Sequence, residues 1–137
     1  MDKVQATCAI IMNHKGELLL TKRAREPFAG CWALPSGIGE AKKGLSPVEA
    51  VIGEVAADLR TAFQCKELFT LPIENDNHVY ETVVFAGSVD ESKIICDPRY
   101  SLGYQWISPE TIDDIGQLAF EHNEIITRYS ALNHGEK

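Results

Sequence analysis

The chain has 137 residues, of which 45% are hydrophobic and 24% are charged, as in an ordinary globular protein. This composition excludes a disordered or collagenous chain, and no apolar stretch approaches the roughly 20 residues that cross a bilayer. The net charge of −7 repels polyanions, so we expect no nucleic-acid polymer as a partner. We also expect no membrane attachment, a cytoplasmic location because no charged-then-apolar leader opens the sequence, and one domain over residues 1–137.

The four cysteines are spread widely and include no C-x-x-C pair. Nothing else in the sequence indicates secretion, so we expect four reduced thiols rather than disulfides. Structural zinc is not expected, because the usual spacing of its ligands is absent.

The first elements are predicted as strands. Apolar runs over residues 4–12 and 17–21 flank Asn13-His14-Lys15-Gly16, a turn-forming cluster, and this pattern predicts a β-hairpin. A charged loop and a short extended piece over residues 32–35 follow. Residues 36–45 contain three glycines and two lysines and are predicted as a loop.

The clearest predicted helix begins after this loop. Ser46 suits the N-cap, Pro47 suits the first helical position, and Glu49 completes a capping box. Apolar residues then recur at helical spacing to about residue 62, which predicts one buried stripe. Its members are Val48, Val51, Ile52, Val55 and Leu59.

The second half of the chain is predicted to supply three more strands and a helix. Residues 64–73, 78–89 and 103–107 are typical of strands, and Ser108-Pro109-Glu110 repeats the chemistry of a helix start. This order of elements predicts an α+β sandwich with one mixed sheet and a helix on each face. The last helix should bury Leu118, Ile125, Ile126, Tyr129 and Leu132.

Residues 32–61 read WALPSGIGEAKKGLSPVEAVIGEVAADLRT and resemble the signature of the Nudix (MutT-like) family, G-x5-E-x7-R-E-U-x-E-E-x-G-U, where U is aliphatic. The run Leu18 to Trp32 resembles the approach to that signature, and Trp106-Ile107-Ser108-Pro109 resembles the closing strand and turn. The resemblance implies an α/β/α sandwich that hydrolyses nucleoside diphosphates linked to another group. It also implies Mg²⁺ or Mn²⁺ held by carboxylates of the signature helix.

The signature is incomplete in this chain. Glu54 is retained, and Asp58 is a shortened form of the last glutamate. Gly37 matches the opening glycine if the loop over residues 38–45 carries two extra residues. The remaining positions differ from the family pattern: Leu45 and Ala57 replace glutamates, Gly53 replaces arginine, and Arg60 replaces the late glycine.

Helical spacing places Glu54 and Asp58 on one side of the helix. Two carboxylates can hold one hard cation whose other ligands are water and phosphate oxygens, so Mg²⁺ or Mn²⁺ should bind weakly. Glu40 in the loop and Glu81 on a strand are candidates for replacing missing ligands. For all four carboxylates the alternative is an ordinary solvated charge.

Lys22, Arg23 and Arg25 form the densest basic group of the chain. They are candidate ligands for a phosphate or carboxylate, which an arginine fork recognises well, with a solvated strand end as the alternative. Phe28 is a candidate for stacking on a base.

Two functions follow. The first is a slow, metal-dependent hydrolase in which Glu54 is a metal ligand or general base and Asp58 is a metal ligand. The second is a binding or regulatory module of the same fold without turnover, favoured by the missing glutamates and arginine. This module would be a nucleotide sensor or a subunit in an assembly. The expected partner is a small nucleotide-type phosphate ligand, and a dimer is compatible with the sequence.

Overall fold

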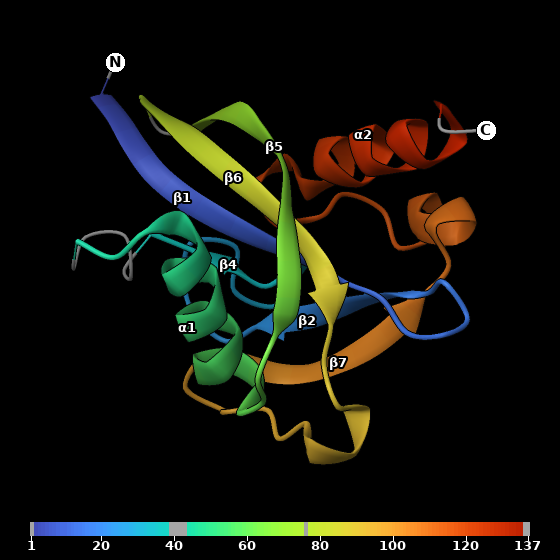
Figure 1. Cartoon of the computed structure of the whole chain (residues 1–137). Coiled ribbons are helices and arrows are strands. Elements are labelled where there is room, and N and C mark those ends of the chain that lie inside the picture. Colours follow the sequence, from blue (N-terminus) through green and yellow to red (C-terminus); the bar gives the residue numbers. More distant parts are fainter. Residues whose placement is uncertain (1, 39–43, 76, 136–137) are drawn as a thin grey trace.

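The computed structural model describes residues 2–38, 44–75 and 77–135 and contains seven strands and two α-helices there (Figure 1). The strands of the first half are β1 (Asp2–Ile11), β2 (Leu18–Arg23), β3 (Trp32–Ala33) and β4 (Ser36–Gly37), and α1 (Pro47–Leu59) follows them. The second half contains β5 (Gln64–Asn75), β6 (His78–Ser88), β7 (Ser101–Ile107) and α2 (His122–Gly135). Three short 3₁₀ helices, η2 (Glu91–Lys93), η3 (Pro109–Asp114) and η4 (Ala119–Glu121), connect the later elements.

The strands divide between two sheets. A four-stranded mixed sheet has the order β4-β1-β6-β5, and its centre is the parallel pair β1 and β6, in register from Asp2 opposite His78 to Ile11 opposite Gly87. A three-stranded antiparallel sheet has the order β3-β2-β7. The α+β class is therefore confirmed, although the expected single sheet is in fact two.

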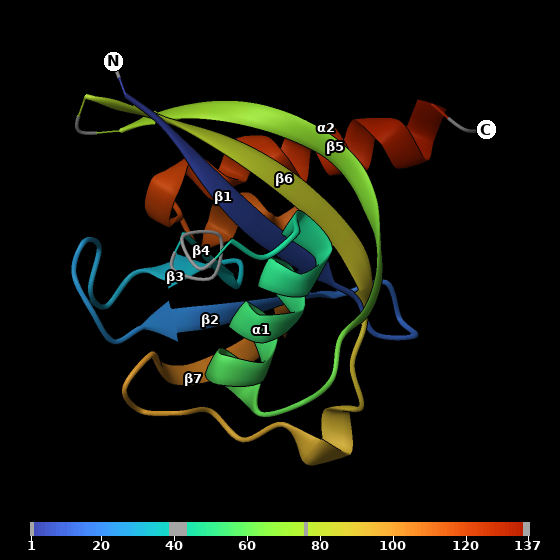
Figure 2. The same ribbon diagram turned by 60° about the vertical axis from the view of Figure 1, so that its left-hand side comes forward.

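Alternation along β1 places neighbouring side chains on opposite sides of the mixed sheet. Cys8 and Ile10 pack in one cluster with Ile125 and Tyr129 of α2. The intervening Ala9 and Ile11 pack in a second cluster with α1. Figures 1 and 2 show the two helices on opposite sides of β1 and β6, so the prediction of a helix on each face is confirmed.

The hairpin predicted over residues 4–21 has the expected turn, but its two strands do not pair with one another beyond that turn. The turn forms, because the Asn13 side-chain oxygen accepts hydrogen bonds from the backbone N–H groups of Lys15 and Glu17, both at 3.0 Å. The strands then separate after a single bridge between Met12 and Leu18. β1 is buried over residues 6–11 and β2 over residues 18–21, and each strand pairs with neighbours in a different sheet.

Helix α1 begins as predicted and ends three residues earlier than expected. The capping box of Ser46 and Glu49 is present, and the left-handed Arg60 (φ 54°) ends the helix. Val48 and Ile52 are 41% and 39% exposed, so the prediction that they are buried is wrong. Glu54, Ala57 and Asp58 turn one side of α1 toward the cleft, and Ile52 lies away from that side. Val48 lies in the first turn of the helix. The buried residues are Ala50, Val51, Val55 and Leu59.

The last third of the chain follows the prediction with shifted boundaries. Ser108 caps a 3₁₀ helix rather than an α-helix, and α2 starts only at His122. Leu118 is buried but precedes α2, whereas Leu132 is 43% exposed and was wrongly assigned to the inner face. Within the described residues, neither helix is both long enough and apolar enough to cross a membrane.

Candidate active site

A cleft of about 510 Å³ opens beside α1 and receives side chains from both sheets and from the start of α2. It brings together four of the residues singled out by sequence: the carboxylates of Glu54 and Asp58 from α1, and the guanidinium groups of Arg23 and Arg25 from β2 and the loop after it. The cleft thus contains both acidic and basic groups, which suits a ligand that carries phosphates and a bound cation.

The Glu54 carboxylate lies directly against the backbone of Gly37 in β4. A methyl group added at Gly37 would overlap the carbon and both oxygens of that carboxylate. Any larger residue at position 37 would therefore displace the Glu54 side chain. Glu54 faces the cleft and not the solvent side of α1, which is the arrangement that a metal site on this helix requires.

Asp58 lies one turn after Glu54, and its pKa is raised. Burial, reinforced by the negative charge of Glu54, raises the pKa of Asp58 to about 7, against the opposing effect of Arg23 and Arg25. Asp58 is therefore only partly deprotonated at neutral pH in the absence of a cation. Any bound cation would favour its charged form.

Aromatic rings contact both arginines, and Arg23 also donates to a backbone carbonyl. Arg23 donates from Nε to the carbonyl oxygen of Pro27 at 2.8 Å and stacks over Phe120 with its Cζ 4.8 Å from the ring centre. Arg25 stacks over Tyr100 at 4.5 Å. Each interaction orients a guanidinium group before any ligand arrives.

Three other candidate residues, Lys22, Phe28 and Glu81, do not line the cleft. Lys22 pairs with Trp32 in the β2–β3 ladder and does not line the cleft. Phe28 is 37% exposed and contacts Phe120 edge to face, with ring centres 4.9 Å apart. Glu81 does not contribute to the lining, and Glu40 is outside the described residues.

The sequence interpretation missed His122, which opens α2 and lines the cleft. Its Nδ1 accepts a hydrogen bond from the backbone N–H of Leu34 at 3.0 Å, and burial lowers its pKa to about 3. A neutral ring whose Nδ1 is an acceptor carries its proton on Nε2. Because the partner of His122 lies 88 positions away, no local pattern could have pointed to it.

The described residues contain no group of three or more metal-binding side chains, and the carboxylates that line the cleft among them are Glu26, Glu54 and Asp58, of which Glu54 and Asp58 lie one turn apart on α1. Mg²⁺ is commonly held by one or two carboxylates with water and substrate phosphates completing its shell. Burial raises the pKa of Asp58, and the negative charge of Glu54 raises it further. A divalent cation between the two carboxylates would offset both effects. The donor set therefore fits one hard cation.

Comparison with known proteins defines the class of this fold and site. The family model described as the NUDIX domain matches residues 2–129, and the chain belongs to the Nudix family. Members of this family generally use divalent metal ions. A curated relative, the ADP-ribose pyrophosphatase of Methanocaldococcus jannaschii, is 28% identical over 91% of this chain and 72% of its own length.

Solved structures share the fold. A MutT protein from Methanosarcina mazei Go1 superposes with a TM-score of 0.83 at 24% identity, covering 96% of each chain. The NUDIX domain of Shewanella oneidensis NrtR, solved in complex with ADP ribose, gives a TM-score of 0.75 at 19% identity over 96% of this chain and 88% of that one.

Proposed function

We propose that this protein hydrolyses a phosphoanhydride bond in a nucleoside diphosphate linked to another group. The observation that carries the proposal is the cleft in which Glu54 and Asp58 lie together with Arg23 and Arg25. The similarity to an ADP-ribose pyrophosphatase over 91% of the chain supports the same chemistry. ADP ribose is accordingly the first substrate to test.

The two arginines bind phosphate oxygens in this proposal. Arg23 is pre-oriented by Pro27 and Phe120, and a planar guanidinium group recognises two oxygens of one phosphate. The ligand is a small molecule and not a nucleic acid, because the net charge of −7 repels a polyanion whereas Arg23 and Arg25 attract a compact one.

Glu54 and Asp58 hold the divalent cation, Mg²⁺ or Mn²⁺, with weak affinity. When bound, the cation neutralises phosphate charge and lowers the pKa of a water molecule. The oxygen of a water molecule attacks one phosphorus, the bond from that phosphorus to the bridging oxygen breaks, and two phosphate-bearing products leave. Glu54, as metal ligand or general base, favours removal of the proton from the attacking water.

A second candidate, a nucleotide-binding or regulatory module without turnover, is favoured by one specific observation. Ala57 lines the cleft between the two carboxylates on α1, at a position where the family signature carries a glutamate. Loss of one electrostatic or acid–base group commonly lowers a rate about 10²- to 10⁴-fold. We therefore expect slow hydrolysis. If the rate falls to zero, the protein is a binding module.

The proposal is tested by incubating the protein with ADP ribose, dinucleotides, nucleotide sugars and nucleoside triphosphates, each with Mg²⁺ or Mn²⁺, and separating the products. The decisive variant is Glu54→Gln, and the matched control is Glu67→Gln on the exposed part of β5. We expect metal-dependent cleavage of at least one substrate, a loss of about 10²-fold or more in Glu54→Gln, and wild-type rates in Glu67→Gln. Equal rates in wild type and Glu54→Gln would refute the assignment.

A further inference from the structure

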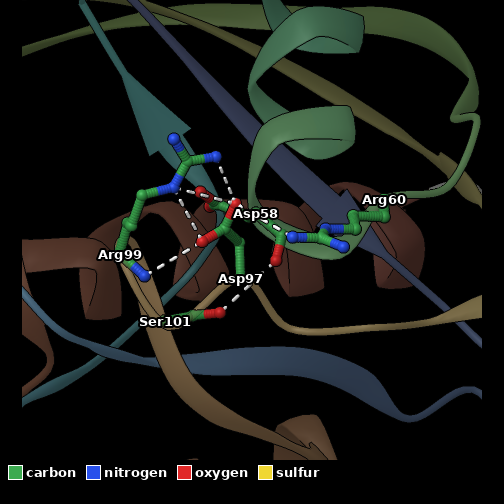
Figure 3. Close-up of polar contacts among 5 residues, drawn as sticks. All are labelled: Asp58, Arg60, Asp97, Arg99 and Ser101. Atoms are coloured by element: carbon green, nitrogen blue, oxygen red, sulfur yellow. Dashed lines mark hydrogen bonds and ion pairs between the residues drawn. The ribbon is translucent and has the colours of Figure 1, made fainter.

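Residues 97–101 form a compact turn that lies against the C-terminal end of α1 (Figure 3). The backbone N–H groups of Tyr100 and Ser101 both donate to the carbonyl oxygen of Asp97, at 2.9 and 2.8 Å. The Asp97 carboxylate accepts a hydrogen bond from the backbone N–H of Arg99 at 3.0 Å, and its side chain is only 4% exposed. The turn is therefore organised around one buried carboxylate.

Two arginines converge on the Asp97 carboxylate. Arg99 donates from Nε to Oδ1 at 3.1 Å and from Nη2 to Oδ2 at 2.7 Å, a two-pronged contact (Figure 3). Arg60, the residue that ends α1, places Nη2 3.6 Å from the same Oδ2. A buried carboxylate shared in this way ties the turn to the end of the helix, and an amide in its place would leave both arginines without a negative charge and with one acceptor oxygen fewer.

The turn and the residues just before it also satisfy the last carbonyl groups of α1, which have no partner within the helix. The backbone N–H of Asp97 donates to the carbonyl oxygen of Asp58 at 3.1 Å, and the Ser101 hydroxyl donates to the same oxygen at 3.4 Å. The backbone N–H of Ile95 donates to the carbonyl oxygen of Leu59 at 2.9 Å. The backbone of a cleft carboxylate is thus held from outside the helix.

The opposite side of the turn contacts the basic part of the cleft. The Tyr100 ring lies under the guanidinium group of Arg25, with Cζ 4.5 Å from the ring centre, and under that of Arg99 at 5.3 Å. Arg25 and Tyr100 both line the cleft. One five-residue turn therefore contacts Asp58 on the acidic side of the cleft and Arg25 on the basic side.

We propose that Asp97 is a positioning residue that fixes the turn 97–101 and thereby sets the placement of Asp58 and Arg25 relative to one another. The proposal rests on the function proposed above, in which Asp58 holds a cation and Arg25 binds phosphate. The placement of these two groups decides whether cation and phosphate meet, and a displacement of about 1 Å can lower a rate about 10²-fold.

Asp97→Asn tests the acidic side, with Asp90→Asn as the matched control. Asp90 is also an aspartate in the β6–β7 connection that caps a turn and faces a cation, Lys93 at 4.0 Å, but it is exposed, whereas Asp97 is buried. Mn²⁺ binding without substrate is measured by electron paramagnetic resonance of the free ion. We expect Asp97→Asn to weaken Mn²⁺ binding about 5-fold or more and to lower kcat about 10- to 10²-fold, with Asp90→Asn within about 2-fold of wild type.

Tyr100→Leu tests the basic side, with Tyr100→Phe as its control because phenylalanine keeps the ring beneath Arg25. We expect Tyr100→Leu to raise KM, or the dissociation constant of ADP ribose, about 3- to 10-fold without changing Mn²⁺ binding, while Tyr100→Phe matches wild type. If Asp97→Asn does not fold, Ser101→Ala removes one donor to Asp58 and should weaken Mn²⁺ binding in the same direction.

A drop in melting temperature alone, with Mn²⁺ affinity, KM and kcat at wild-type values in Asp97→Asn and Tyr100→Leu, would overturn the positioning role. If Asp97→Asn does not fold, unchanged Mn²⁺ binding in Ser101→Ala and unchanged KM in Tyr100→Leu would overturn it in the same way. Wild-type Mn²⁺ binding and activity in Glu54→Gln would instead overturn the proposed function. The two failures are distinguishable because only the second involves Glu54.

Discussion

Gly37 and Glu54 show how a single residue without a side chain shapes the cleft. The glutamate comes from α1 and the glycine from β4, and the carboxylate occupies the space that a side chain at position 37 would fill. The identity of Gly37 is therefore explained by contact with Glu54 and not by backbone conformation, because its φ lies outside the left-handed region.

Gly37→Ala should displace the Glu54 carboxylate. We expect Mn²⁺ binding and turnover to fall about 10-fold or more, since misplacement of a positioned group is costly, while the free energy of unfolding changes by less than about 1 kcal/mol. The measurements are Mn²⁺ titration, initial rates and urea unfolding. In a Glu54→Gln background, Gly37→Ala should cause no further loss of Mn²⁺ binding or turnover. A further loss there would show that Gly37 acts independently of Glu54.

Asp58 predicts a pH dependence of stability in the metal-free protein. Its pKa is about 7 in the folded chain and about 4 when unfolded, so the folded state binds the extra proton between these values. The contribution of Asp58 to stability is present below about pH 4 and is lost as the pH rises through 7.

Asp58→Asn should accordingly raise the free energy of unfolding by about 1–3 kcal/mol at pH 8 in the presence of EDTA, and the gain should disappear near pH 4. Urea denaturation at both pH values measures the difference. Asp114→Asn, on the exposed part of η3, serves as the control and should show no such gain. A wild type more stable than Asp58→Asn at pH 8 without metal would contradict the cause assigned to this pKa.

At the scale of elements, the sequence predicts what is decided locally. The start of α1 depends on Ser46 and Glu49, three positions apart, and the structure confirms it. The exposure of Val48 and Ile52 depends on which strands pack against α1 and where the cleft opens, and periodicity alone does not contain that information. For the same reason the turn after β1 was predicted correctly and the partners of β1 and β2 were not.

A contact between residues far apart in the sequence, the hydrogen bond from Leu34 to His122, fixes the start of α2. His122 must stay neutral to accept the hydrogen bond from Leu34, and its pKa of about 3 lies below the unfolded value of about 6.5. The unfolded chain binds the extra proton between these values, so this contribution to stability is present above about pH 6.5 and is lost as the pH falls through 3.

His122→Asn keeps an acceptor for Leu34 but does not titrate. Between pH 7 and pH 3 the free energy of unfolding of the wild type should fall by about 2–4 kcal/mol more than that of His122→Asn. A packing cost of the substitution is the same at every pH and does not affect this difference. Chemical denaturation across this pH range measures the slope. His14→Asn, at the exposed turn after β1, should retain the wild-type slope, and a wild-type slope in His122→Asn would assign the acid sensitivity to other groups.

At the scale of the whole molecule, the resemblance to the Nudix signature identified the fold and the family, and both are confirmed. Four candidate residues, Glu54, Asp58, Arg23 and Arg25, were selected from short motifs and do meet in one cleft. Their supporting residues could not be selected, because Asp97, Tyr100 and His122 reach the cleft through the folding of distant segments. Motifs identify the groups that carry charge, whereas topology decides what holds them.

The central claim is that this cleft cleaves a phosphoanhydride and does not merely bind one. The most direct measurement is a single-turnover reaction with protein in excess over ADP ribose and saturating Mg²⁺, followed by ³¹P nuclear magnetic resonance, so that even slow chemistry is seen. The account predicts replacement of the diphosphate resonances by those of two phosphomonoesters, in wild type and not in Glu54→Gln. Diphosphate resonances that shift on binding yet persist unchanged over many hours, for ADP ribose and for the other phosphoanhydrides of the panel, would contradict it and establish the protein as a binding module.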